Sequence, residues 1–135
     1  MASIHSEIIV SASPDEAWAA VRDVGRAHVL LFPGILTDVR LDGDARVVTF
    51  ANGMVLRELI VDLDDAERRF VYASVGGRTT HHNSSIQVLP HEGGSRLIWI
   101  TDLLPHELRP AIAALVEQGS AVMKATLDAR PRSAG

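Results

Sequence analysis

The last long segment of the chain, residues 105–130, constrains the fold more than any other part of the sequence. Its entry carries Pro105 and Pro110, and proline is tolerated at the start of a helix but not in its interior. Beyond them, apolar or small residues recur at a spacing of three and four positions: Ile112, Leu115, Val116, Gly119, Val122, Met123, Thr126 and Leu127. This stripe predicts one long helix with a single buried face, which needs another surface to cover it.

A strand and a short helical segment are predicted at the beginning of the chain. Residues 4–10 contain a β-branched run typical of a strand. Ser13 then has the properties of a helix N-cap, and Glu16 stands three positions later, which is the pattern of a capping box. We expect a helix to about residue 23 and a second short helix over residues 26–32, where Pro33 and Gly34 follow.

From residue 35 onward, the apolar residues alternate with a period of two, which is typical of strands with one buried face. The turn signals Asp42-Gly43-Asp44 and Ala51-Asn52-Gly53 predict hairpins. The predicted strands cover residues 35–41, 46–50, 54–63, 69–75, 80–89 and 95–104. Six consecutive strands with short connections favour an antiparallel meander, and the terminal helix is the element available to cover its concave face.

Length and composition are typical of one globular domain, 1–135, of the α+β class. The chain has 135 residues, of which 47% are hydrophobic and 22% charged, and a net charge of −4 with acids and bases interspersed. That charge argues against a nucleic-acid surface. The lack of cysteine excludes a disulfide, a thiol nucleophile and a thiolate metal site.

The two ends of the sequence suggest no targeting or anchoring segment. The N-terminus does not resemble a signal peptide, and no apolar run approaches the roughly 18 residues of a membrane helix, so we expect a cytoplasmic protein without a membrane span. Residues 130–135 are basic and small, and we expect them to form a flexible tail.

Three segments together resemble the motifs of a known superfamily. The first is Ser13-Pro14-Asp15-Glu16-Ala17-Trp18, at the passage from strand to helix. The second is Arg57-Glu58-Leu59-Ile60-Val61-Asp62-Leu63-Asp64-Asp65, a strand with an acidic turn. The third joins Gly76-Gly77 to His82-Asn83-Ser84-Ser85 and residues 97–105. In this order the chain is similar to the START-like superfamily, in its polyketide cyclase/dehydrase (SRPBCC) branch, which also includes the major birch pollen allergen and the plant abscisic acid receptors.

The resemblance implies a helix-grip fold, in which a seven-stranded curved antiparallel sheet wraps around a long C-terminal helix, with two short helices after the first strand. It also implies a cavity between sheet and helix that holds an apolar or amphipathic small molecule, such as a lipid. Two receptor features are missing. Asn52-Gly53 stands where the receptors carry a Ser-Gly-Leu-Pro-Ala gate, and Arg78-Thr79-Thr80-His81 replaces their His-Arg-Leu latch, so hormone-receptor behaviour is not expected.

Glu58 is the first candidate for chemistry, and the sequence leaves two interpretations open. The alternation of the strand alone favours Val55, Leu59 and Val61 as inward residues, which would leave Glu58 on the surface, paired with Arg57 or another neighbour. The resemblance instead places Glu58 in the cavity. There, burial would raise the pKa of the carboxyl group and suit it to act as a general acid or base, or to anchor a polar group of a ligand.

Other candidates come from the strands that follow. His82 and Ser84 share the more apolar face of their strand, whereas His81 points to the other side, so the two histidines cannot bind one metal ion. His82 could equally lie at the rim. Comparison with the family suggests that Trp99 and Thr101 face inward, where Trp99 would serve simply as core packing or would touch a ligand. Tyr72 is expected to line the same cavity.

Candidates on the helical segments are His28, Leu115, Gly119 and Met123. His28 lies near the position of a receptor lysine that meets the ligand acid. Glycine within a helix costs about 1 kcal/mol relative to alanine, so Gly119 indicates close approach of a ligand or of a bulky side chain such as Trp99. Outward-facing Ile98 and Ile100 would suit a homodimer contact.

Three functions are compatible with these residues. The first is binding of a hydrophobic or aromatic small molecule in the cavity, without a metal ion or cofactor. The second is an aromatase/cyclase or dehydratase in which Glu58 and His82 act as acid and base on a poly-β-carbonyl chain. The third is an interaction module with a vestigial cavity. Fold-level resemblance alone does not choose among them.

Overall fold

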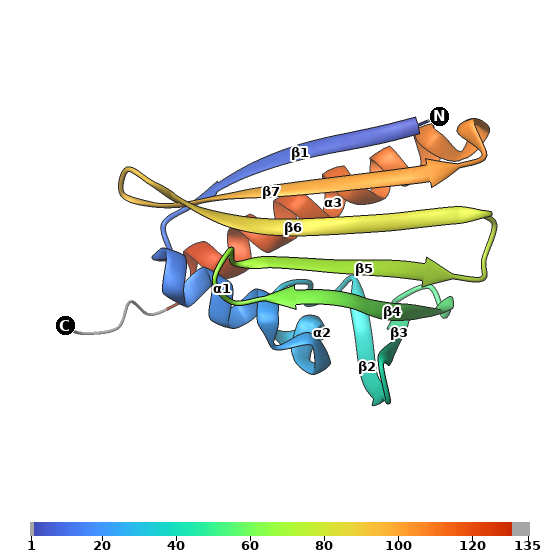
Figure 1. Cartoon of the computed structure of the whole chain (residues 1–135), viewed down its shortest axis with the longest axis horizontal. Coiled ribbons are helices and arrows are strands. Elements are labelled where there is room, and N and C mark those ends of the chain that lie inside the picture. Colours follow the sequence, from blue (N-terminus) through green and yellow to red (C-terminus); the bar gives the residue numbers. More distant parts are fainter. Residues whose placement is uncertain (1, 131–135) are drawn as a thin grey trace.

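Seven strands of the computed structural model, which describes residues 2–130, form one antiparallel sheet in the order β1-β7-β6-β5-β4-β3-β2 (Figure 1). Their bounds are Ala2–Val10 (β1), Leu36–Asp42 (β2), Ala45–Phe50 (β3), Val55–Asp64 (β4), Arg69–Val75 (β5), His81–His91 (β6) and Gly94–Leu104 (β7). Strands β2 to β7 follow one another as a meander, and β1 pairs with β7. The predicted strands are confirmed, with ends that differ by at most two positions.

The short helices after β1 are α1 (Pro14–Arg22), the 3-10 turn η1 (Val24–Arg26) and α2 (Ala27–Leu30). Helix α1 begins where the sequence predicts, because the side chain of Ser13 accepts a hydrogen bond from the backbone N–H of Glu16 at 3.2 Å. The second helix is shorter than the predicted 26–32. Its predicted first residue, Arg26, belongs to the 3-10 turn η1, and α2 ends at Leu30.

The long terminal helix α3 covers Arg109–Asp128 and lies across one face of the sheet (Figure 1). The predicted start at residue 105 is wrong. Pro105 has an extended backbone, with φ −77° and ψ 161°, and a 3-10 turn η2 (His106–Leu108) separates it from α3. None of the helices within residues 2–130 is long and apolar enough to span a membrane.

The predicted tail at residues 130–135 falls mainly on positions 131–135, which lie outside the described residues. Arg130 itself donates a hydrogen bond from Nη1 to the backbone carbonyl of Glu16 at 3.2 Å. The C-terminal end of α3 is therefore tied to α1.

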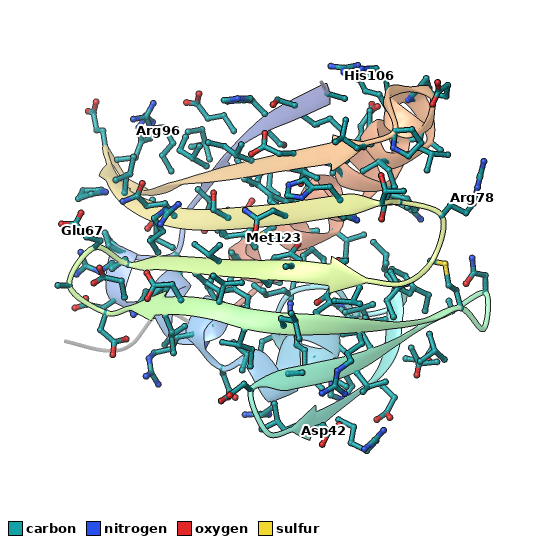
Figure 2. All side chains as sticks on the ribbon, turned by 45° about the vertical axis from the view of Figure 1, so that its right-hand side comes forward. Asp42, Glu67, Arg78, Arg96, His106 and Met123 are labelled. Atoms are coloured by element: carbon teal, nitrogen blue, oxygen red, sulfur yellow. The ribbon has the colours of Figure 1, made fainter. Side chains whose placement is uncertain are left out.

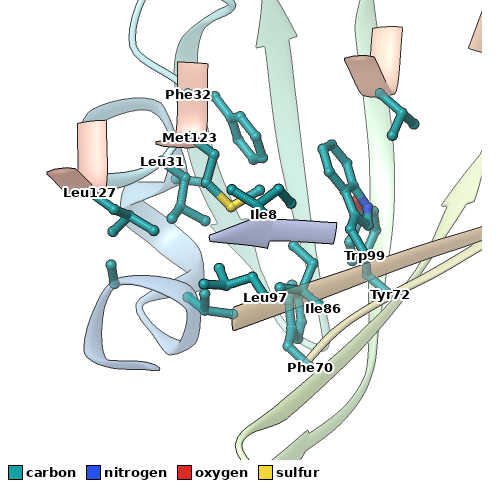
Figure 3. Close-up of a cluster of buried hydrophobic side chains, with 14 of the residues drawn as sticks. Ile8, Leu31, Phe32, Phe70, Tyr72, Ile86, Leu97, Trp99, Met123 and Leu127 are labelled. Atoms are coloured by element: carbon teal, nitrogen blue, oxygen red, sulfur yellow. The ribbon is translucent and has the colours of Figure 1, made fainter. Parts of the chain in front are cut away.

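A cluster of buried apolar side chains lies where α1, the C-terminal half of α3 and the sheet meet (Figure 3). Its largest fully buried side chains include Val21, Phe70, Ile86, Leu97, Met123 and Leu127. On the outer face of the sheet, Ile98 and Ile100 are half-buried, while exposed large apolar side chains gather on β4 and β5 as Val55, Leu59, Val61 and Val75. A dimer contact on this face remains a prediction.

Candidate ligand-binding site

A cavity of about 260 Å³ lies between the inner face of the sheet and the N-terminal half of α3. Its apolar walls include Phe32, Leu36, Phe50, Met54, Leu56, Leu108, Ile112, Leu115 and Val116. Its polar groups come from strands β3 to β7: Arg46, Glu58, Tyr72, Ser74, His82, Ser84 and Thr101. The β5–β6 connection, with Gly76, Gly77, Arg78 and Thr79, lines one end, and Figure 2 shows Arg78 extending outward from that connection.

Eight of the ten candidate residues line this cavity: Glu58, Tyr72, His82, Ser84, Trp99, Thr101, Leu115 and Gly119. Met123 and His28 are not among the lining residues. Met123 is 0% exposed and packs into the dense core one turn of α3 beyond Gly119. His28 lies on α2, where its Nδ1 atom is buried without a hydrogen-bond partner among the described residues.

Glu58 faces inward and forms an ion pair that the sequence interpretation missed. Its Oε1 atom lies 2.8 Å from Nε of Arg46, and the two residues are only 8% and 4% exposed. Arg46 also donates from Nη1 to the backbone carbonyl of Val24 at 3.0 Å. The carboxylate therefore does not stand alone in an apolar pocket, because a buried guanidinium compensates its charge. Arg57, the partner predicted for a surface-exposed Glu58, instead pairs with Asp42 at 2.7 Å on the exposed side.

The position of Arg46 could have been inferred from the β3–β4 hairpin. Its turn at Asn52-Gly53 sets a register in which Thr49 faces Val55, and the same register places Arg46 opposite Glu58. Cross-strand neighbours point to the same side of the sheet. The Arg46–Glu58 pair is therefore indicated by the register between two strands and not by the residue pattern within either strand.

Two aromatic rings support the guanidinium of Arg46. Its Cζ atom lies 5.2 Å from the ring centroid of Phe70 and 5.3 Å from that of Tyr72, which are cation–π distances. Burial raises the pKa of the Tyr72 phenol to about 12, and the negative charge of Glu58 acts in the same direction. The phenol therefore stays protonated and remains a hydrogen-bond donor at neutral pH.

His82 lies half-buried beside this group. Burial lowers the pKa of its imidazole below the ordinary value, the charge of Glu58 opposes that shift, and His81 adds to it. A neutral imidazole has one nitrogen that can accept a proton. The charge of Glu58 thus acts on both the phenol of Tyr72 and the imidazole of His82. Carboxylates, phenols and imidazoles are the groups that proteins use for proton transfer.

Trp99 belongs both to the buried core and to the lining of the cavity. A β-carbon at position 119 would lie 3.0 Å from Cη2 of Trp99 and 3.1 Å from its Cζ3, so glycine there is what lets the indole approach α3. Of the two explanations for Gly119, close packing on Trp99 is the one that the structure contains. Phe32 packs on the same indole, with ring centroids 5.6 Å apart. Among the polar groups of the cavity, the hydroxyls of Ser84 and Thr101 share a hydrogen bond of 2.9 Å.

Comparison with known proteins gives a family and a shared fold. A family model described as polyketide cyclase / dehydrase and lipid transport matches residues 1–130. The solved structure of XoxI from Bacillus cereus is 19% identical, with a TM-score of 0.84 over 94% of this chain and 96% of that one. Truncated norcoclaurine synthase from Thalictrum flavum is 22% identical, with a TM-score of 0.67 over 96% and 95%. No curated protein sequence matches the chain.

Proposed function

This chain belongs to the polyketide cyclase / dehydrase and lipid transport family, and we propose that it binds an apolar or aromatic small molecule between its sheet and α3. The observation that carries the proposal is the cavity itself, whose walls are mainly apolar and whose polar groups converge at the sheet. Small-molecule sites commonly combine an apolar lining with a few placed polar groups. The open volume favours this function over an interaction module with a filled, vestigial cavity.

The size of the cavity limits the ligand. The cavity volume of about 260 Å³ lies just below the lower end of the roughly 300–1,000 Å³ typical of small-molecule pockets. A compact one- or two-ring compound suits a volume of this size. Because Glu58 and Arg46 balance each other, the proposed ligand needs no net charge to compensate them.

A pair of matched substitutions on α3 tests the proposal. Ile112 and Val122 are both half-buried aliphatic residues, but only Ile112 lines the cavity. We expect Ile112→Trp to fill the space and to weaken binding of small bicyclic aromatics at least about tenfold, because a loss of about 55 Å² of buried apolar ligand surface already costs about 1.4 kcal/mol. Val122→Trp should leave the affinity within about twofold. Isothermal titration calorimetry measures both, and equal affinities for the two variants would contradict the proposal.

A second candidate function is catalysis of an aldol or dehydration step. The observation that favours it is the convergence of Glu58, Tyr72 and His82 on the cavity floor. Such chemistry needs a base to remove a proton beside a carbonyl group and an acid to assist the loss of water. If the protein is an enzyme, His82→Gln should abolish turnover of a model poly-β-carbonyl compound while the compound still binds. Binding of that compound by the wild-type protein without turnover would limit the function to binding.

A further inference from the structure

The buried ion pair between Arg46 and Glu58 makes one of the two hydrogen bonds that such a pair can form. On the surface, Arg22 and Asp65 make both, from Nε to Oδ1 at 2.8 Å and from Nη2 to Oδ2 at 3.4 Å. Within residues 2–130, Arg46 and Glu58 are joined by the first bond alone, from Nε to Oε1 at 2.8 Å. One edge of a guanidinium group matches the two oxygens of a carboxylate, so the pair leaves the donor Arg46 Nη2 and the acceptor Glu58 Oε2 unmatched.

The unmatched donor, Nη2 of Arg46, faces open space. The other two nitrogens of the guanidinium are engaged, Nε by Glu58 and Nη1 by the backbone carbonyl of Val24 at 3.0 Å. Nη2 has no hydrogen-bond partner within residues 2–130, yet it is not enclosed. In that part of the chain, the enclosed side-chain atoms without a partner are His28 Nδ1 and Trp99 Nε1. Because Arg46 is 4% exposed and lines the cavity, the space that Nη2 reaches is the cavity.

The unmatched acceptor, Oε2 of Glu58, is weakly engaged. Among the described residues, its hydrogen bond comes from the hydroxyl of Ser74 at 3.4 Å, whereas a hydroxyl group bound to a carboxylate usually lies at about 2.5–2.7 Å. A carboxylate oxygen can accept more than one hydrogen bond. Glu58 is 8% exposed and lines the same cavity as Arg46. A buried oxygen of this kind therefore retains capacity for a donor that enters the cavity.

Both groups are held in place by their neighbours. The rings of Phe70 and Tyr72 lie 5.2 Å and 5.3 Å from Cζ of Arg46, and the hydrogen bond to Val24 holds the guanidinium from another side. The register of β3 and β4 places Arg46 opposite Glu58. Donor and acceptor are thus preorganised, so a ligand that uses them loses little free energy to their ordering.

The charges of the pair decide what kind of ligand group fits beside it. A ligand carboxylate would add a second negative charge next to Glu58, and a ligand ammonium would add a second positive charge next to Arg46. Either charge would lack a counter-charge in a mainly apolar cavity. A ketone or ether oxygen accepts from Nη2 but donates nothing to Oε2. A hydroxyl group does both, because it has one donor and two acceptor lone pairs.

We propose that the cavity selects neutral ring compounds with a hydroxyl group, such as phenols, whose hydroxyl accepts from Arg46 Nη2 and donates to Glu58 Oε2. This proposal rests on the proposed function and names the ligand class. The ring of the ligand lies along the apolar walls, which include Leu56 on the sheet and Ile112 on α3. The ion pair then serves as the polar end of the site, and the apolar walls serve as the rest of it.

Four naphthalenes that differ in one substituent test the proposal, with affinities measured by equilibrium dialysis at neutral pH. In 2-methylnaphthalene a methyl group of similar size replaces the hydroxyl of 2-naphthol. The probe 2-methoxynaphthalene keeps the acceptor but lacks the donor, and 2-naphthoate is an anion. We expect 2-naphthol to bind at least about tenfold more tightly than each of the other three, because hydrogen bonds to charged groups are stronger than those between neutral groups.

Two double variants give the second readout. Arg46→Met with Glu58→Leu removes the donor and the acceptor together and leaves no unpaired buried charge, so 2-naphthol and 2-methylnaphthalene should then bind within about twofold of each other. The control, Asp42→Asn with Arg57→Gln, removes an exposed ion pair of 2.7 Å on the outer face and should preserve the tenfold preference. If the first variant does not fold, the four affinities of the wild-type protein decide the question.

The outcomes separate this inference from the proposed function. Equal affinities for 2-naphthol and either its methyl or its methoxy analogue overturn the hydroxyl proposal and leave ligand binding intact. Tightest binding of 2-naphthoate overturns the preference for a neutral group. A preference for 2-naphthol that survives in the Arg46→Met, Glu58→Leu variant overturns the role of the ion pair. Failure of both 2-naphthol and 2-methylnaphthalene to bind overturns the hydroxyl proposal and also contradicts the proposed function.

Discussion

The two halves of α3 have different surroundings, although they belong to one helix with one inward face. In the C-terminal half, Met123 and Leu127 are 0% and 1% exposed and pack against the sheet and α1. In the N-terminal half, Ile112 is half-buried and Leu115 is 42% exposed, and both face the cavity. Gly119 stands between the halves, where it receives the indole of Trp99.

The difference indicates how the fold divides stability from binding. Side chains fill one end of the space between sheet and helix, and well-packed apolar groups supply most of the folding free energy. The other end keeps an open volume, and its polar groups are satisfied mainly by one another: Arg46 by Glu58, and Ser84 by Thr101. The packed half can therefore hold the helix in place while the open half remains available to a ligand.

The largest effect is expected when the ion pair of the open half loses one member. Glu58→Gln leaves the buried guanidinium of Arg46 without its counter-charge, which should lower the free energy of unfolding by about 3–5 kcal/mol. Urea denaturation followed by circular dichroism measures the change. The double variant with Arg46→Met and Glu58→Leu removes both charges and should recover most of the loss. A decrease below about 1 kcal/mol for Glu58→Gln would show that solvent reaches the pair.

Truncation of the two halves of α3 compares them directly. Met123→Ala should cost about 2–5 kcal/mol, because it leaves a cavity in the packed half. Leu115→Ala, a truncation of similar size, should cost less than about 1 kcal/mol, since that side chain is already 42% exposed. Thermal and urea unfolding of both variants provide the measurement. Equal losses would mean that the open half contributes to stability as much as the packed half.

The boundary between the halves is tested by Gly119→Ala. Alanine improves helix propensity by about 1 kcal/mol, but its β-carbon would lie 3.0 Å from the Trp99 ring, and overpacking of a core costs about 1–3 kcal/mol. We expect a net loss of up to about 2 kcal/mol in the free energy of unfolding. Trp99→Phe removes the ring atoms that clash, so the combined variant should be less destabilised than the sum of the two single changes. If the losses in free energy of unfolding of the two single variants simply add up in the double variant, the clash between the alanine β-carbon and the Trp99 ring is contradicted.

The smallest effect concerns Tyr72 and appears only in alkali. It is the one tyrosine of the chain, so the ultraviolet absorption of phenolate reports this residue alone. Its folded pKa is raised from 10.0 to about 12, so the stabilisation from the buried neutral phenol is complete below pH 10 and is lost as the pH rises toward 12. Neutral-pH stability should be unaffected. Phenolate absorption near pH 10 in the folded protein would show that the ring is open to solvent.

Much of the fold follows from local sequence signals. The hairpins at Gly43 and Gly53 are set by a few turn residues, and both glycines have positive φ, 59° and 90°, as such turns require. The cap of α1 is equally local, since Ser13 and Glu16 are three positions apart. The start of α3 was misplaced because proline suits a position just before a helix as well as the first helical position, and Pro105 takes the extended conformation.

The candidate site was predictable where alternation along a strand applies. His82 and Ser84 line the cavity on the more apolar face of their strand, because every second residue of a strand points to the same side. Alternation also puts Trp99 and Thr101 on one face, and the family resemblance indicated that this face points inward. Glu58 needed the family resemblance, since its own strand is more apolar on the other face. Helical periodicity predicts the buried face of α3, and hence Met123, but not the position along the helix axis where close packing ends.

The sequence by itself determined the order of strands and helices, the hairpin turns and which residues share one face of a strand, because these depend on residues that are close together in the chain. Only the tertiary structure decided that Arg46 neutralises Glu58, that Trp99 rests on Gly119 and that the packed core stops there, which leaves about 260 Å³ open. These features depend on how closely elements that are distant in sequence approach one another. The separation between such elements is set by the volumes of all the side chains that lie between them.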